Sequence, residues 1–289
     1  MREGDAYVDG TRALIREAVI RVLGKEPTDI AAPCCGERGN RLLFIGLPGA
    51  SHHSFSYDPA PTGQERLPAE IMGVYGRLER ALEAAVRKGG DGANEDYSRG
   101  YALNQDATAR SIQLELRRSA VLHESALLRV VGQSADVSHR QVAAHALGYA
   151  TQSRQQILAL VRAARDPDET VRNNATRALA VLARSDARLA SEIPASTFVN
   201  MLTSGIWSDR NKAAWLLAEL TAGRDARLLA SIRQGALDAL IEMTLWRRSG
   251  HAWSSRLVLG RIAGIPEPRL NELIWNGPVQ AIVDAARGL

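Results

Sequence analysis

Residues 166–183 read DPDETVRNNATRALAVLA, and this stretch decides the fold class. Pro167 ends one helix, because proline has no backbone N–H to donate and its ring clashes inside a helix. From Val171 onward apolar residues recur at the spacing of a helix that buries one face. The stretch therefore predicts the turn between two helices, followed by an amphipathic second helix.

The pattern of this second helix recurs along the chain. It is found in HRQVAAHALGYA from residue 139, in DRNKAAWLLAEL from 209 and in HAWSSRLVLGRI from 251. Arg140, Arg172 and Arg210 align, at steps of 32 and 38 residues, and a last step of 42 residues leads to Ala252. Further amphipathic stretches lie between the copies, at 155–164, 194–203 and 232–245. A single helix pair cannot bury its apolar face, so we predict a mainly α fold, an α-α superhelix of about four stacked helix pairs.

The turn and second helix in residues 166–183 resemble those of HEAT repeats, and residues 208–220 are similar. The four copies cover about residues 123–277, a little over half of the chain. In HEAT proteins an aspartate in the turn and an arginine one turn later form a hydrogen-bonded ladder between stacked repeats. The resemblance thus implies an armadillo-like α-solenoid in which Asp166, Arg172 and Arg140 have a structural role. Ala252 replaces the arginine in the fourth copy, as in a terminal capping repeat.

The chain before the repeats has a different organisation. Residues 1–68 predict a small α+β unit, with a helix over 9–23, strands at 41–47 and 52–57 around a turn at 48–51, and a third strand near 29–32. Residues 69–105 predict a helix that begins after Pro68 and stops at Gly89, followed by a polar linker. We expect the repeat solenoid to occupy residues 106–289.

The composition excludes several classes of protein. Of the 289 residues 45% are hydrophobic, 5% aromatic and 24% charged, as in a folded helical protein and not a disordered one. The net charge of +4 is uneven: residues 1–105 carry 13 basic and 15 acidic side chains, and residues 106–289 carry 23 and 17. Two adjacent cysteines, the lack of an apolar signal core near the start and the lack of a membrane-length apolar run favour a cytoplasmic protein with no membrane segment.

Residues with catalytic or metal-binding chemistry are few. Cys34, Cys35, His52 and His53 carry the donor atoms of a zinc site, but adjacent cysteines rarely reach one ion, so we favour two partly buried thiols. The stretch GLPGAS at 46–51 lacks the lysine of a phosphate-binding loop and indicates a hairpin turn. The sequence therefore predicts no catalytic residue, no metal and no cofactor.

Tryptophans near the predicted turns are candidates for binding. Trp207 and Trp253 lie beside polar residues there, and exposed tryptophans are natural anchors for a partner. The alternative is that both are half-buried caps. Their polar neighbours, which complete this candidate surface, are Asp209, Arg210, Lys212 and His251.

Two further groups have alternative interpretations. The repeat arginines with Lys212 form either a strip that binds phosphates or the structural ladder. In the linker, Glu95, Asp96 and Arg99 either contact a partner or belong to a solvated loop whose Tyr101 enters the core. We favour the structural alternative in both cases.

Three functions fit these observations. The first is a non-enzymatic scaffold that binds another protein on the solenoid surface, and it needs no residue that the sequence lacks. The second is nucleic-acid binding or repair, by analogy with HEAT-like alkylpurine DNA glycosylases, and the third a lyase or chaperone role like that of HEAT-like bilin lyases. We expect a protein partner, with nucleic acid as the alternative, and the oligomeric state stays open.

Overall fold

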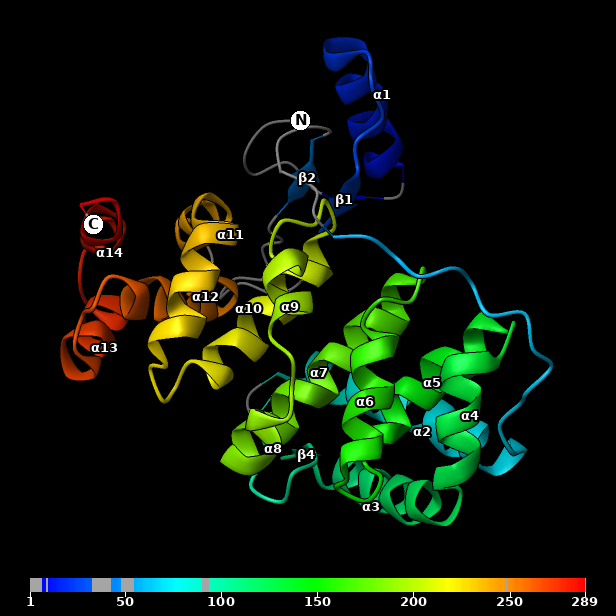
Figure 1. The fold of residues 1–289 in the computed structure, drawn as a ribbon. Coiled ribbons are helices and arrows are strands. Elements are labelled where there is room, and N and C mark those ends of the chain that lie inside the picture. The colour runs from blue at the N-terminus through cyan, green and yellow to red at the C-terminus, as the bar shows by residue number, and fades with distance from the viewer. Residues whose placement is uncertain are drawn as a thin grey trace. The chain divides into compact units, whose positions relative to one another are not determined.

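The computed structural model describes residues 7–8, 10–32, 43–47, 55–89, 94–247 and 249–288. Within them the chain is mainly α-helical, with two short two-stranded sheets (Figure 1). It divides into two compact units: unit 1 contains residues 1–55 and 196–289, and unit 2 contains residues 56–195. The predicted mainly α fold class is confirmed, and both units are built from paired helices.

Unit 2 contains three successive helix pairs and one small hairpin. The pairs are α2 (Ala69–Lys88) with α3 (Ala107–Leu122), α4 (Glu124–Gln133) with α5 (Val137–Leu147), and α6 (Arg154–Ala163) with α7 (Glu169–Ser185). The short helix α8 (Ala187–Ser191) follows. Between α2 and α3, strands β3 (Glu95–Asp96) and β4 (Leu103–Asn104) pair antiparallel.

The repeat pattern explains how the pairs in unit 2 stack. The side chain of Asp168 accepts a hydrogen bond from the backbone N–H of Val171 and so caps the start of α7. Ala175 and Leu179 of α7 are fully buried, as are the aligned residues of α5. A Cβ added to Gly148 would lie 3.0 Å from the Cβ of Ala178, so the two second helices pack closely at small residues.

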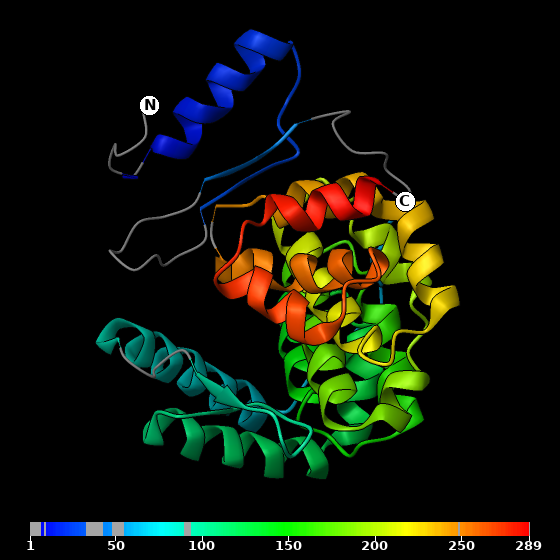
Figure 2. The same cartoon turned by 90° about the vertical axis from the view of Figure 1, so that its left-hand side faces the viewer.

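Unit 1 combines the N-terminal elements with the last three helix pairs. The elements are α1 (Thr11–Leu23), β1 (Asp29–Ala31), β2 (Phe44–Gly46), α9 (Ser196–Met201), α10 (Trp207–Leu220), α11 (Ala226–Thr244), α12 (Ser249–Ile262), α13 (Glu267–Trp275) and α14 (Gln280–Arg287). Helix α13 lies within the range of the four predicted copies, and α14 lies beyond it. Helix α1 lies on the side of the β1–β2 hairpin away from α9–α14 (Figure 2).

The strand pairing differs from the sequence prediction. Strand β2 pairs antiparallel with β1, with Ile45 opposite Ile30. Residues 52–54 of the expected second strand lie outside the described residues. Residues 55–57 are not a strand, while the expected turn at 48–51 lies outside the described residues. The predicted third strand is therefore the partner of the first, because pairing depends on the tertiary packing of both faces and not on nearness in sequence.

Candidate functional site

The repeat arginines of unit 2 lie in the interior. Arg140 makes a bidentate ion pair with Asp166, which belongs to the next helix pair. Its Nε donates to Oδ2 at 2.7 Å and one Nη donates to Oδ1 at 3.0 Å. Its other Nη donates to the carbonyls of Ser134 and Ala135 in its own turn. Arg172 repeats this last contact one repeat later, because it donates to the carbonyls of Asp166 and Pro167, at 2.9 Å each.

Arg210 in unit 1 has a similar role. It is buried, and its two Nη atoms lie 3.0 and 3.1 Å from the carboxylate oxygens of Glu242 in the following helix pair. Its guanidinium lies 5.9 Å from the ring centre of Phe44 and 5.5 Å from that of Trp246. Arg210 therefore connects two helix pairs and the β1–β2 hairpin.

The neighbours of Arg210 also contact the hairpin. The backbone N–H of Trp207 donates to the carboxylate of Asp29 at 2.9 Å, and the ring of Trp207 meets that of His251 edge-on at 5.0 Å. The Nε1 of Trp207 is buried without a hydrogen-bond partner among the described residues. Asp209 is buried and accepts a hydrogen bond from Ser204. Trp207 and Arg210 thus face the chain's own N-terminal hairpin.

The remaining candidates, Lys212 and Trp253, are less buried than Arg210. Lys212 is half-buried, with its Nζ 5.6 Å from the ring centre of Trp215. Trp253 is half-buried on α12. Trp275 on α13, which the sequence did not single out, is 66% exposed. The structure brings Trp207, Arg210 and His251 together around the hairpin and leaves Lys212 beside Trp215.

The linker candidates lie in unit 2. The carboxylate of Glu95 pairs with Arg177 of α7. Asp96 accepts from the backbone N–H of Ser98 and lies 4.0 Å from Arg110. The carbonyl of Arg99 accepts a hydrogen bond from Gln152. The linker is therefore folded against the helices, and Glu95 contacts α7.

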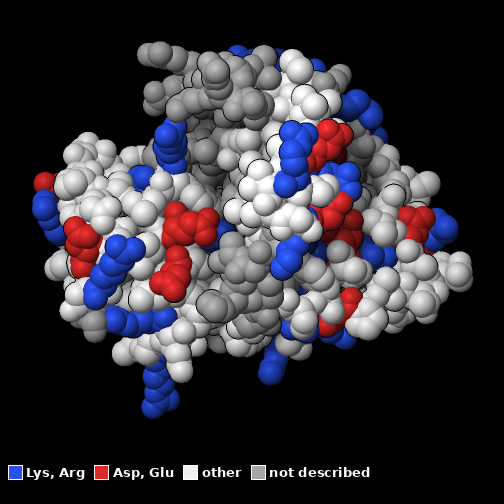
Figure 3. Space-filling view, turned by 90° about the horizontal axis from the view of Figure 1, so that it is seen from above, with Lys and Arg blue, Asp and Glu red and all other residues white. Residues whose placement is uncertain are grey.

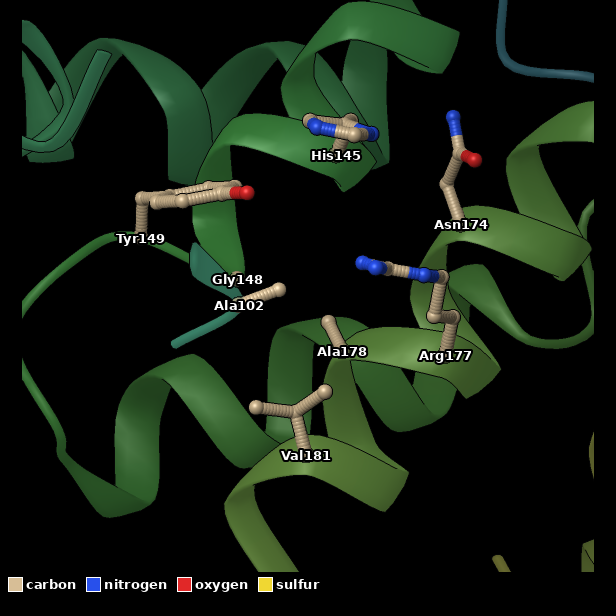
Figure 4. Close-up of a pocket in the computed structure, with 8 residues that line it drawn as sticks. All are labelled: Ala102, His145, Gly148, Tyr149, Asn174, Arg177, Ala178 and Val181. Atoms are coloured by element: carbon tan, nitrogen blue, oxygen red, sulfur yellow. The ribbon is translucent and has the colours of Figure 1, made fainter. Parts of the chain in front are cut away.

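A small polar cavity lies beside Glu95 and Arg177. His145 and Tyr149 at the end of α5 and Asn174 and Arg177 of α7 surround it (Figure 4). The remaining lining residues are Ala102, Gly148, Ala178 and Val181. Its volume of about 10 Å³ is room for about one water molecule and excludes an organic substrate.

The protonation states of this cluster follow from burial and from Arg177. Burial and the charge of Arg177 lower the pKa of His145 to about 3, so the ring is neutral at pH 7. Burial and the nearby Glu95 raise the pKa of Tyr97 to about 12. Burial would lower the pKa of Arg177, but the carboxylate of Glu95 outweighs it and raises the pKa. The groups that line the cavity therefore offer hydrogen-bond donors and one paired cation at neutral pH.

His145 is the least satisfied polar group of the cluster. Its ring lies edge-on to Tyr75 at 5.0 Å and stacks on Tyr149 at 5.7 Å. Its Nε2 atom is buried and has no hydrogen-bond partner among the described residues. A buried polar atom without a partner is costly, so a water molecule or a ligand group in the cavity would lower the free energy of this site.

Sequence reasoning missed these residues although a signal was present. His145 follows Arg140 by five positions, and Arg177 follows Arg172 by five, so both occupy the same position of successive second helices. The aligned residue of the third copy is Trp215. A position that carries large polar or aromatic side chains, among helices whose neighbouring positions are alanine and leucine, indicates a face that is not closed by apolar packing.

A second candidate surface lies at α1. An apolar groove of about 660 Å³ runs between α1 and strand β2 of the hairpin. Leu14 and Val22 of α1 are 68% and 80% exposed, and Leu43, Ile45 and Leu47 alternate along the strand side of the groove. The other residues that line it are Val8, Thr11, Ile15, Ala18, Val19 and Leu23.

No metal site is found in the described part of the chain, and the one face drawn in Figure 3 shows no broad basic patch. No group of three or more His, Cys, Asp or Glu side chains there could hold a metal ion, and Cys34, Cys35, His52 and His53 lie outside it. On the face drawn in Figure 3 the described basic and acidic side chains lie beside one another. Several basic residues of the repeats, including Arg140, are buried and so do not add to a surface charge. None of the described helices has the length and apolarity needed to cross a membrane.

No family model and no curated protein matches this chain. Among solved structures it is similar to a designed armadillo repeat protein in complex with the peptide (KR)4, with 17% identity, 64% of this chain and 93% of that chain covered, and a TM-score of 0.44. It is also similar to a computationally designed armadillo repeat protein for modular peptide recognition, with 18% identity, 77% of this chain and 99% of that chain covered, and a TM-score of 0.46.

Proposed function

We propose that this chain is a protein-interaction scaffold, and that the groove at α1 takes an amphipathic helix of the partner protein. The observation that carries the proposal is the open apolar groove between α1 and β2, with a volume of about 660 Å³. Contiguous apolar surface of this kind on a folded protein marks a place where another molecule docks.

The geometry of the groove favours a helix as its occupant. Leu14, Ala18 and Val22 lie on one face of α1 at the i, i+4, i+8 spacing of a helix packing seam. Opposite them the side chains of Leu43, Ile45 and Leu47 form one face of an extended strand. An apolar stripe of a partner helix would contact both walls at once, as in other helix-in-groove complexes.

The charges beside the groove specify the partner further. By their positions around the helix, Arg21 lies next to Leu14 on one edge of the apolar stripe, with Glu17 one turn before it, and Arg12 and Arg16 lie on the other edge. Arg16 is paired with Glu26, while Arg12 and Arg21 are exposed and form no ion pair among the described residues. Acidic residues on the flank of the partner's stripe that faces Arg12 would complement this net positive edge.

The test compares two synthetic amphipathic helices that share one leucine stripe, one with glutamates on both flanks and one with lysines. Their affinity for the full chain is measured by fluorescence anisotropy. We expect the acidic helix to bind at least about ten-fold more tightly, with a difference that shrinks as salt is added. Leu14→Glu and Val22→Glu should each weaken its binding by about ten-fold or more, because both place a carboxylate in the apolar contact.

A matched control distinguishes the groove from general surface stickiness. Leu122 at the end of α3 is 74% exposed and lies in unit 2, so Leu122→Glu should leave the affinity unchanged. Equal binding of the two peptides would contradict the charge argument. Self-association of the chain that Leu14→Glu abolishes would assign the groove to a second copy and overturn the proposal.

A further inference from the structure

We infer that the face of α5 and α7 around Arg177 is a second binding site, for an extended peptide with a carboxylate two residues before a tyrosine. In this structure the chain's own residues 94–99, the strap, occupy the site. The site lies wholly in unit 2 and is independent of the groove at α1.

The strap contacts the helices through charged and polar groups. Glu95 pairs with Arg177, and the hydroxyl of Tyr97 donates to the Oε2 of Glu95 at 3.0 Å. The guanidinium of Arg184 lies 5.4 Å from the ring centre of Tyr97, as a cation over an aromatic face. Arg177 and Arg184 are two turns apart on the same face of α7. One can therefore bind the carboxylate, and the other the aromatic ring, of the same extended peptide.

The strap is separable from the part of the linker that belongs to the core. Ala102 and Leu103 are buried, and the backbone N–H of Asn104 donates to buried Gln113 at 2.6 Å. Asn94, Ser98 and Arg99 are exposed, in contrast. Gly100, which divides the two parts, has φ of +76°, a conformation that glycine adopts without strain. Only two residue pairs join β3 to β4, so the strap can open at Gly100 while Leu103 stays in place.

The surface around the strap retains unused capacity for a ligand. The Nε2 of His145 is buried without a hydrogen-bond partner among the described residues and lines the polar cavity (Figure 4). Asn174 and Arg177 line the same cavity with groups that can donate to a peptide carbonyl. The cavity has room for one water-sized group. A peptide that supplied the carboxylate of Glu95 and placed a single carbonyl oxygen there would therefore make a contact that the strap lacks.

The probe for this site is the peptide NEDYSR, which has the sequence of residues 94–99. Its affinity is measured by calorimetry for the wild-type chain and for the double variant Glu95→Gln, Tyr97→Ala, whose fold is checked by circular dichroism. We expect the double variant to bind the peptide at least about ten-fold more tightly than the wild type, since the strap no longer competes. The peptide with glutamine in place of its single glutamate should lose this affinity.

Variants of α7 identify where the peptide binds. In the background of the double variant, Arg184→Met should weaken binding, because it removes the cation beside the tyrosine ring, and Arg177→Met should abolish it. Arg162→Met, an exposed arginine on α6, is the matched control and should leave the affinity unchanged. A double variant that is folded and binds no peptide would overturn the inference.

A measurement on the unmodified chain tests the opening of the strap directly. In amide hydrogen exchange we expect residues 94–99 to exchange at least about a hundred-fold faster than the buried amides of α7, because a locally opened strap needs no global unfolding. Exchange of the strap as slow as that of α7 would show that it is an integral part of the fold, and would overturn the inference even if the double variant failed to fold. Either result leaves the helix-binding test at α1 unaffected.

Discussion

Helices α1 and α7 have the same kind of sequence and opposite surroundings. Both carry an apolar stripe at helical spacing, interrupted by charged residues. Helix α7 buries eleven of its 17 residues, whereas α1 buries two of its 13, Thr11 and Ile15. Helix α7 is covered by α5 and α6 in unit 2, but in the described residues of unit 1 α1 contacts little more than β1.

This difference teaches how an amphipathic pattern should be interpreted. The spacing of apolar residues indicates that a face is to be covered, and it does not indicate what covers it. In α7 the covering elements come from the same chain, and the helix is part of a core. In α1 the same pattern leaves Leu14 and Val22 exposed, which is why we assign its covering element to another molecule.

The largest expected effect concerns the buried contact between α5 and the turn before α7, and the substitution that tests it is Arg140→Ala. The change removes the partner of Asp166, whose carboxylate is buried and would then lack its cation. Breaking a buried ion pair from one side typically costs about 3–5 kcal/mol. We expect a loss of this size in the free energy of unfolding, measured by urea denaturation.

The exposed Arg162 on neighbouring α6 provides the reference for this measurement. Arg162→Ala should change the free energy of unfolding by less than about 0.5 kcal/mol. If the two substitutions cost the same, Arg140 does not connect the helix pairs, and the assignment of Asp166, Arg172 and Arg140 to a ladder is wrong.

The buried polar cluster adds a dependence on pH. The pKa of His145 is about 3 in the folded chain and 6.5 in the unfolded chain. Between these two pH values the unfolded chain therefore binds a proton that the folded chain does not. The contribution of the neutral His145 ring to the free energy of unfolding is complete above pH 6.5 and is lost as the pH falls toward 3. At about 1.4 kcal/mol per pH unit below 6.5, the free energy of unfolding should fall by about 2 kcal/mol between pH 7 and pH 5.

The variant His145→Phe isolates this contribution. It keeps a ring against Tyr75 and Tyr149 but has no titrating group, so its unfolding free energy should lose about 2 kcal/mol less than that of the wild type over the same pH range. Urea denaturation of both chains at the two pH values gives the comparison. Parallel losses would show that His145 takes up its proton in the folded state as easily as in the unfolded one.

Much of the fold could be predicted because its signals are local. Pro68 and Gly89 mark both ends of α2, and Gly24 ends α1 in the left-handed conformation that favours glycine. Leu147 and Leu179 align as repeat positions, and both are fully buried. Strand pairing could not be predicted in this way, since β2 pairs with residues 29–31, which are separated from it by more than ten residues of sequence.

The candidate sites were harder to predict because their contacts are distant in sequence. Glu95 and Arg177 are 82 residues apart, and Trp207 meets Asp29 across 178 residues. The sequence indicated Glu95 and Trp207 as candidates, but no local pattern predicted which residues they contact. An arginine or tryptophan at the start of a helix has the same sequence signature whether it faces solvent or another segment of its own chain.

The smallest expected effect is at the exposed apolar face of α1, and it is measured against the buried face of α7. Leu179→Ala in α7 leaves a cavity in a packed core and should cost about 2–5 kcal/mol of unfolding free energy. Leu14→Ala in α1 removes a side chain that is 68% exposed and should cost less than about 0.5 kcal/mol. Urea denaturation of the free chain measures both. A cost at Leu14 close to that at Leu179 would mean that the groove is already filled by the chain itself. A negligible cost in the free chain, together with weakened binding of the acidic helix, is the combination that only an external occupant produces, because a residue retained for folding alone would show its effect without a partner.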